Sequence, residues 1–189
     1  MATRKILCCG DPVLRRRARR VKSIDEELIE LLREMKEMML QAYGLGLAAP
    51  QVGELTAAVI VRPDPEEDDT IELINPRIVE REGEEEGLEG CLSLPTLRGM
   101  VIRPARVVVE ALSEDGQEIV IQGEGMLARA VAHEVDHLFG RLFIDEVELD
   151  SLTWMRPDED EESGYRLEPT TLEEALAAFE RLRKRRGDE

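Results

Sequence analysis

The sequence predicts an α+β fold in which short mixed or antiparallel β-sheets pack around one central helix, with an N-terminal and a C-terminal helix outside them. Apolar residues recur at helical spacing in three segments, at about residues 23–43, 124–138 and 170–186. Between them lie short runs rich in β-branched residues, bounded by glycine, proline or acidic residues. The central helical segment carries both histidines of the chain, so we expect it to hold the chemistry as well as the core.

The composition fits one acidic globular domain. The chain has 189 residues, 42% of them apolar, which suffices for a core without cross-links. Its net charge of −17 argues against general binding to nucleic acid, DNA included, or to an anionic membrane. No apolar run approaches the ~20 residues of a membrane span, and the apolar start is too short for a secretory signal. Three cysteines form no even disulfide framework, so we expect a cytoplasmic protein.

The N-terminal part combines an irregular arm with a helix. Residues 4–20 predict an extended arm with a turn at residues 10–12. The arginines within residues 15–20 could form a nucleic-acid patch, but such clusters in an acidic protein more often neutralise nearby carboxylates. Ser23 and Glu26 predict a capping box at the start of the first helix. The apolar stripe of this helix, with its methionines, is expected to be core and not a cofactor site.

The middle of the chain predicts strands and connections. Residues 44–53 are small and glycine-rich, but their spacing matches neither a dinucleotide fingerprint nor a phosphate loop. Strands are predicted at residues 55–62, as two short strands at 71–82 interrupted at Asn75-Pro76, as a hairpin at 105–112 and 117–122, and at 141–147. Residues 83–88 have the composition of a connection, being glycine and glutamate with one leucine. After an acidic loop at residues 157–162, a last helix begins at Thr170 or Thr171, each followed by glutamate three residues later.

Residues 133–137, with the sequence HEVDH, predict a metal site. On a helix, His133 and His137 share one face and can bind a single ion, while Glu134 lies about 100° around the axis, beside any bound water. This H-E-x-x-H pattern usually denotes two metal ligands and a general base. A catalytic site commonly has three protein ligands. Since the chain has no third histidine, the third ligand must be Cys, Asp or Glu.

Several residues are candidates for this third ligand. Cys91 offers a thiolate, which suits a borderline-soft metal, although a lone buried cysteine is often only part of a core. Asp145, Glu146 and Glu148 are compatible in spacing with a different class, an H-E-x-x-H metallopeptidase. The residues alone leave both possibilities open.

Three separated segments resemble the peptide deformylase family. They are residues 44–51 (GLGLAAPQ), residues 89–93 (EGCLS) and residues 133–137 (HEVDH), in the order and spacing of that family. The start at residues 10–15 (GDPVLR) is similar as well, so the resemblance spans about residues 4–150. It implies a catalytic domain over residues 1–150. Residues 151–189, an acidic loop and a C-terminal helix with a basic tip, would extend the same domain.

The resemblance implies a role for each matching residue. The metal ligands would be Cys91, His133 and His137. The metal, one divalent ion per chain, is typically Fe²⁺ in this family, and Ni²⁺, Co²⁺ or Zn²⁺ can replace it. Glu134 would take a proton from the attacking water and later pass one to the leaving amine. The side-chain amide of Gln51 and the backbone N–H of Leu92 would stabilise the oxyanion.

The implied reaction removes the N-formyl group from the N-terminal formyl-methionine of newly made peptides and releases formate. The peptide would lie as a strand against Leu45, Gly46 and Gly90, because glycine lets another backbone approach closely. An apolar slot formed by Leu45, Met126 and the stem of Arg129 would take the methionine side chain. A non-catalytic metal-binding module is disfavoured, because a purely structural metal site would need neither the base nor the oxyanion donors.

Other expectations concern the surroundings of the site. Glu89 is expected to pair with Arg98 or Arg103 and so to hold the loop of the candidate cysteine ligand. Ala132 stands where most relatives carry glutamine, a position that is neither ligand nor base.

The segment after Asp150 follows no family pattern. The basic tip at residues 181–186 would either contact the ribosome, as a basic C-terminal helix can in bacterial members, or balance the helix macrodipole in solvent.

Overall fold

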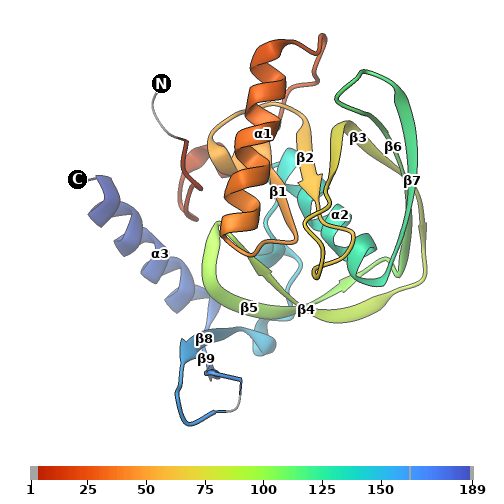
Figure 1. Ribbon diagram of the computed structural model, residues 1–189. Coiled ribbons are helices and arrows are strands. Elements are labelled where there is room, and N and C mark those ends of the chain that lie inside the picture. The colour runs from red at the N-terminus through yellow and green to blue at the C-terminus, as the bar shows by residue number, and fades with distance from the viewer. Residues whose placement is uncertain (1–3, 162, 188–189) are drawn as a thin grey trace.

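The computed structural model describes residues 4–161 and 163–187, which form two antiparallel sheets and three helices (Figure 1). The helices are α1 (Glu26–Gln41), α2 (Gly125–Leu138) and α3 (Leu172–Gly187). The first sheet has the order β1-β2-β3-β6-β7, with the strands Gly46–Ala48, Ala58–Val61, Ile71–Glu82, Arg106–Leu112 and Glu118–Glu124. The second has the order β4-β5-β8-β9, with the strands Glu85–Cys91, Leu94–Arg103, Thr153–Pro157 and Tyr165–Pro169. The predicted α+β class is confirmed.

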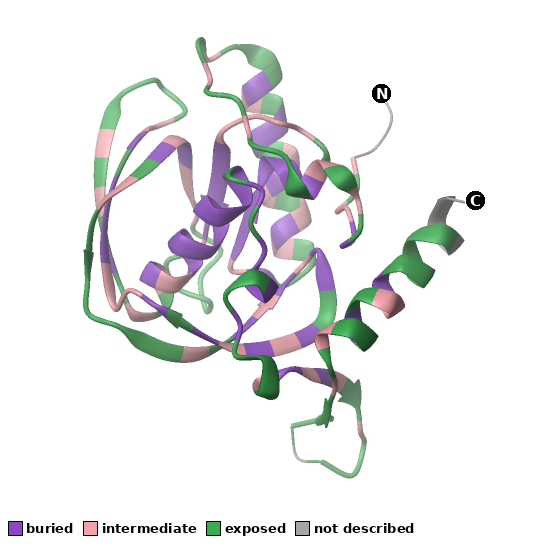
Figure 2. Ribbon diagram, turned by 180° about the vertical axis from the view of Figure 1, so that it is seen from behind, coloured by how far each residue is buried: buried purple, intermediate pink, exposed green. Residues whose placement is uncertain are grey.

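Helix α2 is the centre of the molecule, as the sequence predicts. Every residue from Ala130 to Leu138 is buried, and Figure 2 shows this helix enclosed by the strands. Its apolar side packs against one face of the first sheet, with Val59 and Val61 among its neighbours in the same core cluster. Since successive residues of a strand point to opposite faces, Ala58 and Ile60 bury the other face against α1. The first sheet is therefore covered on both faces where it positions the histidine helix.

Helix α1 begins later than the sequence suggests. The backbone N–H of Leu28 donates to the Asp25 carboxylate at 3.0 Å, so Asp25 and not Ser23 is the N-cap. The predicted capping box of Ser23 and Glu26 is therefore wrong, because Glu26 is the first helical residue. The buried stripe that includes Met35 and Met39 is core, as expected.

Two strand predictions need correction. Residues 71–82 form the single strand β3, in which the pairing to β6 shifts between Ile74 and Arg77. Asn75 adopts a φ of 55° at this bulge, a conformation that asparagine tolerates, and its side chain exchanges hydrogen bonds with the Val21 backbone. Residues 141–147 are no strand: Phe143 and Ile144 are buried in a 3₁₀ turn, Phe143–Asp145, and Val147 makes only an isolated bridge to Val101. There the Leu142 N–H donates to the Asp145 carboxylate at 2.9 Å.

The hairpin of β4 and β5 is missing from the sequence prediction. Residues 83–88 read as a connection, yet Glu85–Cys91 is an edge strand that pairs with Leu94–Arg103. Glycine and glutamate have low intrinsic strand propensity, and the long cross-strand pairing overrides it. This hairpin matters because its first strand, β4, ends at Cys91, a candidate metal ligand.

The C-terminal segment packs on the body of the protein. Thr171 and Glu174 cap α3 reciprocally: the Glu174 N–H donates to the Thr171 hydroxyl at 3.2 Å, and the Thr171 N–H donates to the Glu174 carboxylate at 3.1 Å. This confirms the helix start predicted there. Phe179 of α3 is buried, with its ring centroid 5.5 Å from that of Trp154 on β8. Figure 1 shows α3 and the β8–β9 hairpin on the side away from β6 and β7.

The N-terminal arm is irregular, as predicted, with a turn closed by the Asp11 N–H and the Cys8 carbonyl and a short 3₁₀ turn at Pro12–Arg15, where Leu14 is buried. Arg15 pairs with Asp145 at 2.5 Å, and the guanidinium of Arg17 lies 4.9 Å from the centroid of the Phe139 ring. The ion pair supports a neutralising role for the arginine cluster. Among the described residues, no helix is long and apolar enough to cross a membrane.

Candidate metal centre

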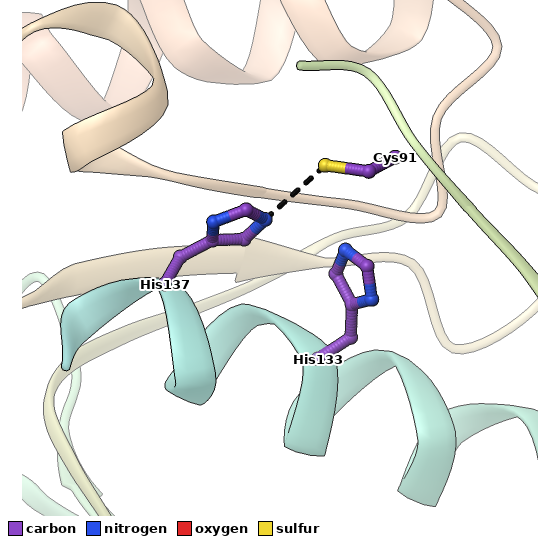
Figure 3. Close-up of side chains that lie close together, drawn as sticks. All are labelled: Cys91, His133 and His137. Atoms are coloured by element: carbon purple, nitrogen blue, oxygen red, sulfur yellow. Dashed lines mark hydrogen bonds between the residues drawn. The ribbon is translucent and has the colours of Figure 1, made fainter. Parts of the chain in front are cut away.

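The centre is built where the end of β4 meets the C-terminal half of α2. The potential ligand atoms of Cys91, His133 and His137 all lie within 4.8 Å of one another, and all three residues are buried. Cys91 is the last residue of β4, and its Sγ lies 3.3 Å from Nε2 of His137 (Figure 3). The two histidines project from successive turns of α2, as their spacing predicts. One sulfur and two imidazole nitrogens suit a single first-row divalent metal.

The acidic candidates for the third ligand are not part of this group. Asp145, Glu146 and Glu148 are exposed. Asp145 instead pairs with Arg15 and caps the 3₁₀ turn. Of the choices that the residues alone left open, the structure brings only the cysteine to the histidines.

Glu89 holds His133 from the side of β4. Its carboxylate lies 2.9 Å from Nδ1 of His133 and accepts further hydrogen bonds from Arg103 at 2.8 and 3.0 Å and from Arg129 at 3.0 Å. Burial alone would raise the pKa of Glu89, but the hydrogen bonds from His133 and Arg103 outweigh it and lower the pKa to about 2. Because an ionised carboxylate only accepts, Nδ1 carries the proton and Nε2 is left as the ligand atom.

Of the two arginines expected to pair with Glu89, Arg103 does so, and it also donates to Asp136 of α2 at 2.6 Å. Arg98 instead donates to the Leu97 carbonyl at 2.9 Å and lies against Gly90, where a Cβ would collide with its guanidinium. Sequence reasoning left Asp136 out, although it lies within the HEVDH motif.

Glu134, the residue after His133 on α2, is also buried. Its Oε2 has no hydrogen-bond partner among the described residues. Burial is the main cause that raises the pKa of Glu134 to about 7, and the nearby Glu89 charge adds to it, while His133 and Arg103 oppose it. A Cβ at Gly46 would lie 2.5 Å from Oε1 of Glu134. Glycine is therefore required there by this carboxylate, a reason that the sequence did not reveal.

Gln51 reaches the centre from a buried 3₁₀ turn, Ala49–Val52. Its Nε2 lies 3.4 Å from Sγ of Cys91 and 3.3 Å from the Ser93 hydroxyl, and its Oε1 accepts from the Ala48 N–H at 2.7 Å. The structure thus brings Gln51 beside the cysteine despite 40 residues of separation.

A cavity of about 450 Å³ opens from the centre to solvent between β1, β4 and α2. Its lining contains all the residues that the sequence analysis assigned to the substrate: Leu45, Gly46, Gly90, Met126 and Arg129. Leu92, the predicted backbone donor, also lines it. Tyr43 and Leu88 line the cavity too and were not predicted; both are exposed, at 90% and 49%. In the sequence, Tyr43 is marked only as an aromatic residue directly before the glycine-rich segment.

Hydrolytic metal centres combine protein ligands with a proton-accepting side chain in a cleft. The same combination here, on an α+β scaffold, places this chain among the metal-dependent hydrolases. The family model of polypeptide deformylase matches residues 3–152. The chain therefore belongs to the peptide deformylase family, and neither the metallopeptidase nor the non-catalytic alternative is favoured.

Individual relatives agree with this assignment. The chain is 46% identical over 170 residues to the peptide deformylase of Thermomicrobium roseum, covering 87% of this chain and 97% of the relative. The peptide deformylase structure from Synechococcus elongatus, solved with actinonin, is 40% identical with a TM-score of 0.75, covering 78% of this chain and 82% of that one. A Plasmodium falciparum peptide deformylase is 30% identical with a TM-score of 0.79, covering 95% and 97%. The last similarity therefore extends past residue 152 into the C-terminal segment.

Proposed function

We propose that this protein removes the formyl group from the N-terminal formyl-methionine of newly made peptides and releases formate. The observation that carries the proposal is the buried group of Cys91, His133 and His137 together with Glu134, whose Oε2 has no hydrogen-bond partner among the described residues; Cys91, His133 and Glu134 line the cavity. The peptide deformylases that the chain resembles over most of its length support the same reaction.

The proposed cofactor is one divalent metal, Fe²⁺ in the native protein, with Ni²⁺, Co²⁺ or Zn²⁺ as substitutes. The donor set supports a metal of this kind, because thiolate and imidazole suit these ions. When bound, such a metal supplies the Lewis acidity that activates water at neutral pH. Metal analysis of protein purified without oxygen tests the choice of ion: iron near one per chain is expected, and stoichiometric zinc alone would contradict it. Peroxide should inactivate the Fe²⁺ form faster than the Ni²⁺ form.

The proton transfers are assigned to Glu134. Its free Oε2 takes the proton of the attacking water and later gives one to the leaving amine. Burial raises the pKa of Glu134 to about 7 in the metal-free site, and this favours proton uptake by its carboxylate. The side chain of Gln51 and the backbone N–H of Leu92 are proposed as donors to the developing oxyanion, and the position of Gln51 beside Cys91 supports this.

The peptide is proposed to lie between β1 and β4, which are edge strands of the two sheets. Edge strands offer unpaired backbone groups to an extended peptide, and Leu45, Gly46 and Gly90 line the cavity there. The methionine side chain would enter the part of the cavity lined by Met126 and Arg129.

Formate release from formyl-Met-Ala-Ser tests the function. The purified, metal-loaded protein should release formate, and the Cys91→Ser variant should bind metal poorly and release none. If the wild-type protein releases no formate although metal analysis shows one ion per chain, the proposal is wrong. Cleavage of the Met-Ala bond in place of formate release would favour a peptidase.

We also propose that residues 1–150 are the catalytic unit and that residues 151–189 extend the same domain in the cytoplasm. Support comes from Phe179 and Trp154, which belong to the same core cluster as Cys91. None of the three cysteines, all within the described residues, is part of a disulfide, which suits a reducing compartment.

Ribosome contact through the basic helix tip is a separate proposal. Arg181, Arg183 and Lys184 are exposed there, and Lys184 also pairs with Glu180 at 2.8 Å. Deleting the helix would uncover core, so replacing these three residues by glutamate is the cleaner test. Co-sedimentation with ribosomes should fall, and unchanged co-sedimentation would contradict the proposal.

A further inference from the structure

We infer that Arg129 is a positioning residue, which couples the wall of the substrate cavity to the metal ligand His133 through the Glu89 carboxylate. The inference rests on the proposed function for the nature of the cavity, but the contacts that carry it do not depend on the substrate. An apolar slot needs only the stem of this side chain. In the structure, the guanidinium of Arg129 makes specific hydrogen bonds as well.

The guanidinium of Arg129 ties α2 to both strands of the β4–β5 hairpin. Its Nη1 lies within hydrogen-bond distance of the Val101 carbonyl at 2.9 Å, the Glu89 carboxylate at 3.0 Å and the Gly87 carbonyl at 3.3 Å. Its Nη2 donates to the Glu85 carbonyl at 2.7 Å. The side chain is 14% exposed and forms part of the cavity wall.

The backbone opposite is shaped for this guanidinium. A Cβ at Gly87 would lie 2.7 Å from both Cζ and Nη2 of Arg129, so any larger residue would displace the group. With three carbonyl acceptors around it, this is a fitted site for a planar guanidinium. Neither the glycine nor the carbonyls would be needed if Arg129 served only as an apolar wall.

Two arginines donate to Glu89, and only one of them, Arg129, belongs to α2, the helix that carries His133. Arg103 of β5 binds both oxygens of Glu89. Arg129 stands four residues before His133, on the same face of α2. It therefore fixes the position of Glu89 relative to the part of α2 that carries His133. This maintains the 2.9 Å contact between the Glu89 carboxylate and Nδ1 of His133.

Loss of the guanidinium should therefore loosen the metal although the ligands remain. Removing a partner that directly contacts a ligand typically changes metal affinity by about 10–100-fold. Arg129 acts one contact further out, so we expect about 3–10-fold. The stem of the side chain, and with it the apolar wall, would be kept by methionine.

The test compares Arg129→Met with wild type in the Co²⁺-loaded protein. Metal release to a chelator should be about 3–10-fold faster, and the Co²⁺ absorption spectrum should change, because the His133 ligand is less well oriented. Arg129→Lys should restore part of the effect, since an ammonium can still bind Glu89. The matched control is Arg141→Met, which removes a half-exposed arginine from the other end of the network, 2.6 Å from Asp136. It should release metal within about twofold of wild type.

Release rates and spectra of Arg129→Met that equal those of wild type would overturn the inference, and Arg129 would then be only a cavity wall. If Arg129→Met fails to fold, Arg129→Leu, which also lacks the charged group, decides by the same readouts. The outcome is independent of catalysis: absence of formate release by wild type defeats the proposed function, whereas unchanged metal release in the variants defeats only the role of Arg129.

Discussion

Two buried carboxylates lie near His133, Glu89 on β4 and Glu134 on α2, and they differ in their hydrogen-bond partners. On the β4 side, Glu89 accepts hydrogen bonds from two arginines and the histidine. Burial would raise its pKa, but the hydrogen bonds from His133 and Arg103 outweigh this and lower the pKa to about 2. On the α2 side, Glu134 has one oxygen without a partner, and burial raises its pKa to about 7.

The difference shows how one residue type serves two purposes at the same centre. A carboxylate that fixes the tautomer of a metal ligand must remain ionised, so it needs permanent positive partners. A carboxylate that transfers protons must change its state near neutral pH, and burial without a direct cationic partner achieves this. The surrounding residues, and not the residue type, therefore suit Glu89 to supporting a ligand and Glu134 to proton transfer.

The largest expected effect comes from removing the proton-transfer group. Glu134→Gln keeps the shape but not the basicity, so formate release should fall by about 10²–10⁴-fold. Metal content should stay at the wild-type level, because Glu134 is not among the grouped ligand atoms. Kinetic assay together with metal analysis checks both parts. A decrease of less than tenfold would mean that the two carboxylates do not differ as proposed.

Replacing Glu89, the supporting carboxylate, should instead lower the stability of the fold and the affinity for the metal. Glu89→Gln leaves Arg103 without one of its two buried carboxylate partners. Breaking such a pair should lower the free energy of unfolding by about 3–5 kcal/mol and weaken metal binding by about 10–100-fold. Denaturant unfolding and chelator competition measure these effects.

Glu110→Gln is the matched control for this variant. It breaks an exposed arginine–glutamate pair with Arg77 on the first sheet, so it should change stability by less than about 1 kcal/mol. Equal effects of the two substitutions would refute the supporting role of Glu89.

The sequence was informative about local features of this arrangement and silent about the long-range ones. His133, Glu134 and His137 follow from helical spacing alone, and the α2 helix that carries them is where the pattern placed it. The spacing could not show that β4 exists, because strand pairing overrides its glycine- and glutamate-rich composition.

Local patterns were also insufficient at residues 141–147, where a strand was predicted and the structure has a 3₁₀ turn. The apolar residues of this segment are buried as a strand pattern suggests, but the side chain of Asp145 closes a turn there. The roles of Gly46 and Gly87 depend on side chains about 90 and 40 residues away, which no local pattern contains.

The pH dependence of stability should separate the two carboxylates in the metal-free protein. Because the folded-state pKa of Glu134 is about 7 and its ordinary value 4.5, the folded state binds more protons than the unfolded state between these values. Its contribution therefore destabilises the fold as pH rises from about 4.5 to 7. Glu134→Gln should be more stable than wild type at pH 8, by on the order of 3 kcal/mol.

This advantage should disappear toward pH 4, where Glu134 is protonated in both states. Glu89 has the opposite sign, since its folded-state pKa is depressed from 4.5 to about 2. Its stabilisation is present above about pH 4.5 and is lost as pH falls toward 2. Thermal unfolding of both variants across pH 2–8 measures these windows. A difference between Glu134→Gln and wild type that does not vary with pH would show that Glu134 is not perturbed.

The smallest effect, and the most specific one, concerns the space in which Glu134 is free. A Cβ at position 46 would lie 2.5 Å from Oε1 of Glu134, and the nearest atoms to it all belong to that side chain. Gly46→Ala should therefore lower the free energy of unfolding by about 1–3 kcal/mol, the usual range for overpacking, and reduce formate release while metal binding persists. Placed in a Glu134→Ala background, the same substitution has no carboxylate to displace, so its effect on unfolding should shrink to about 0.5 kcal/mol or less. If the destabilisation by alanine is the same in both backgrounds, position 46 requires glycine for another reason, and the freedom of Glu134 does not depend on β1.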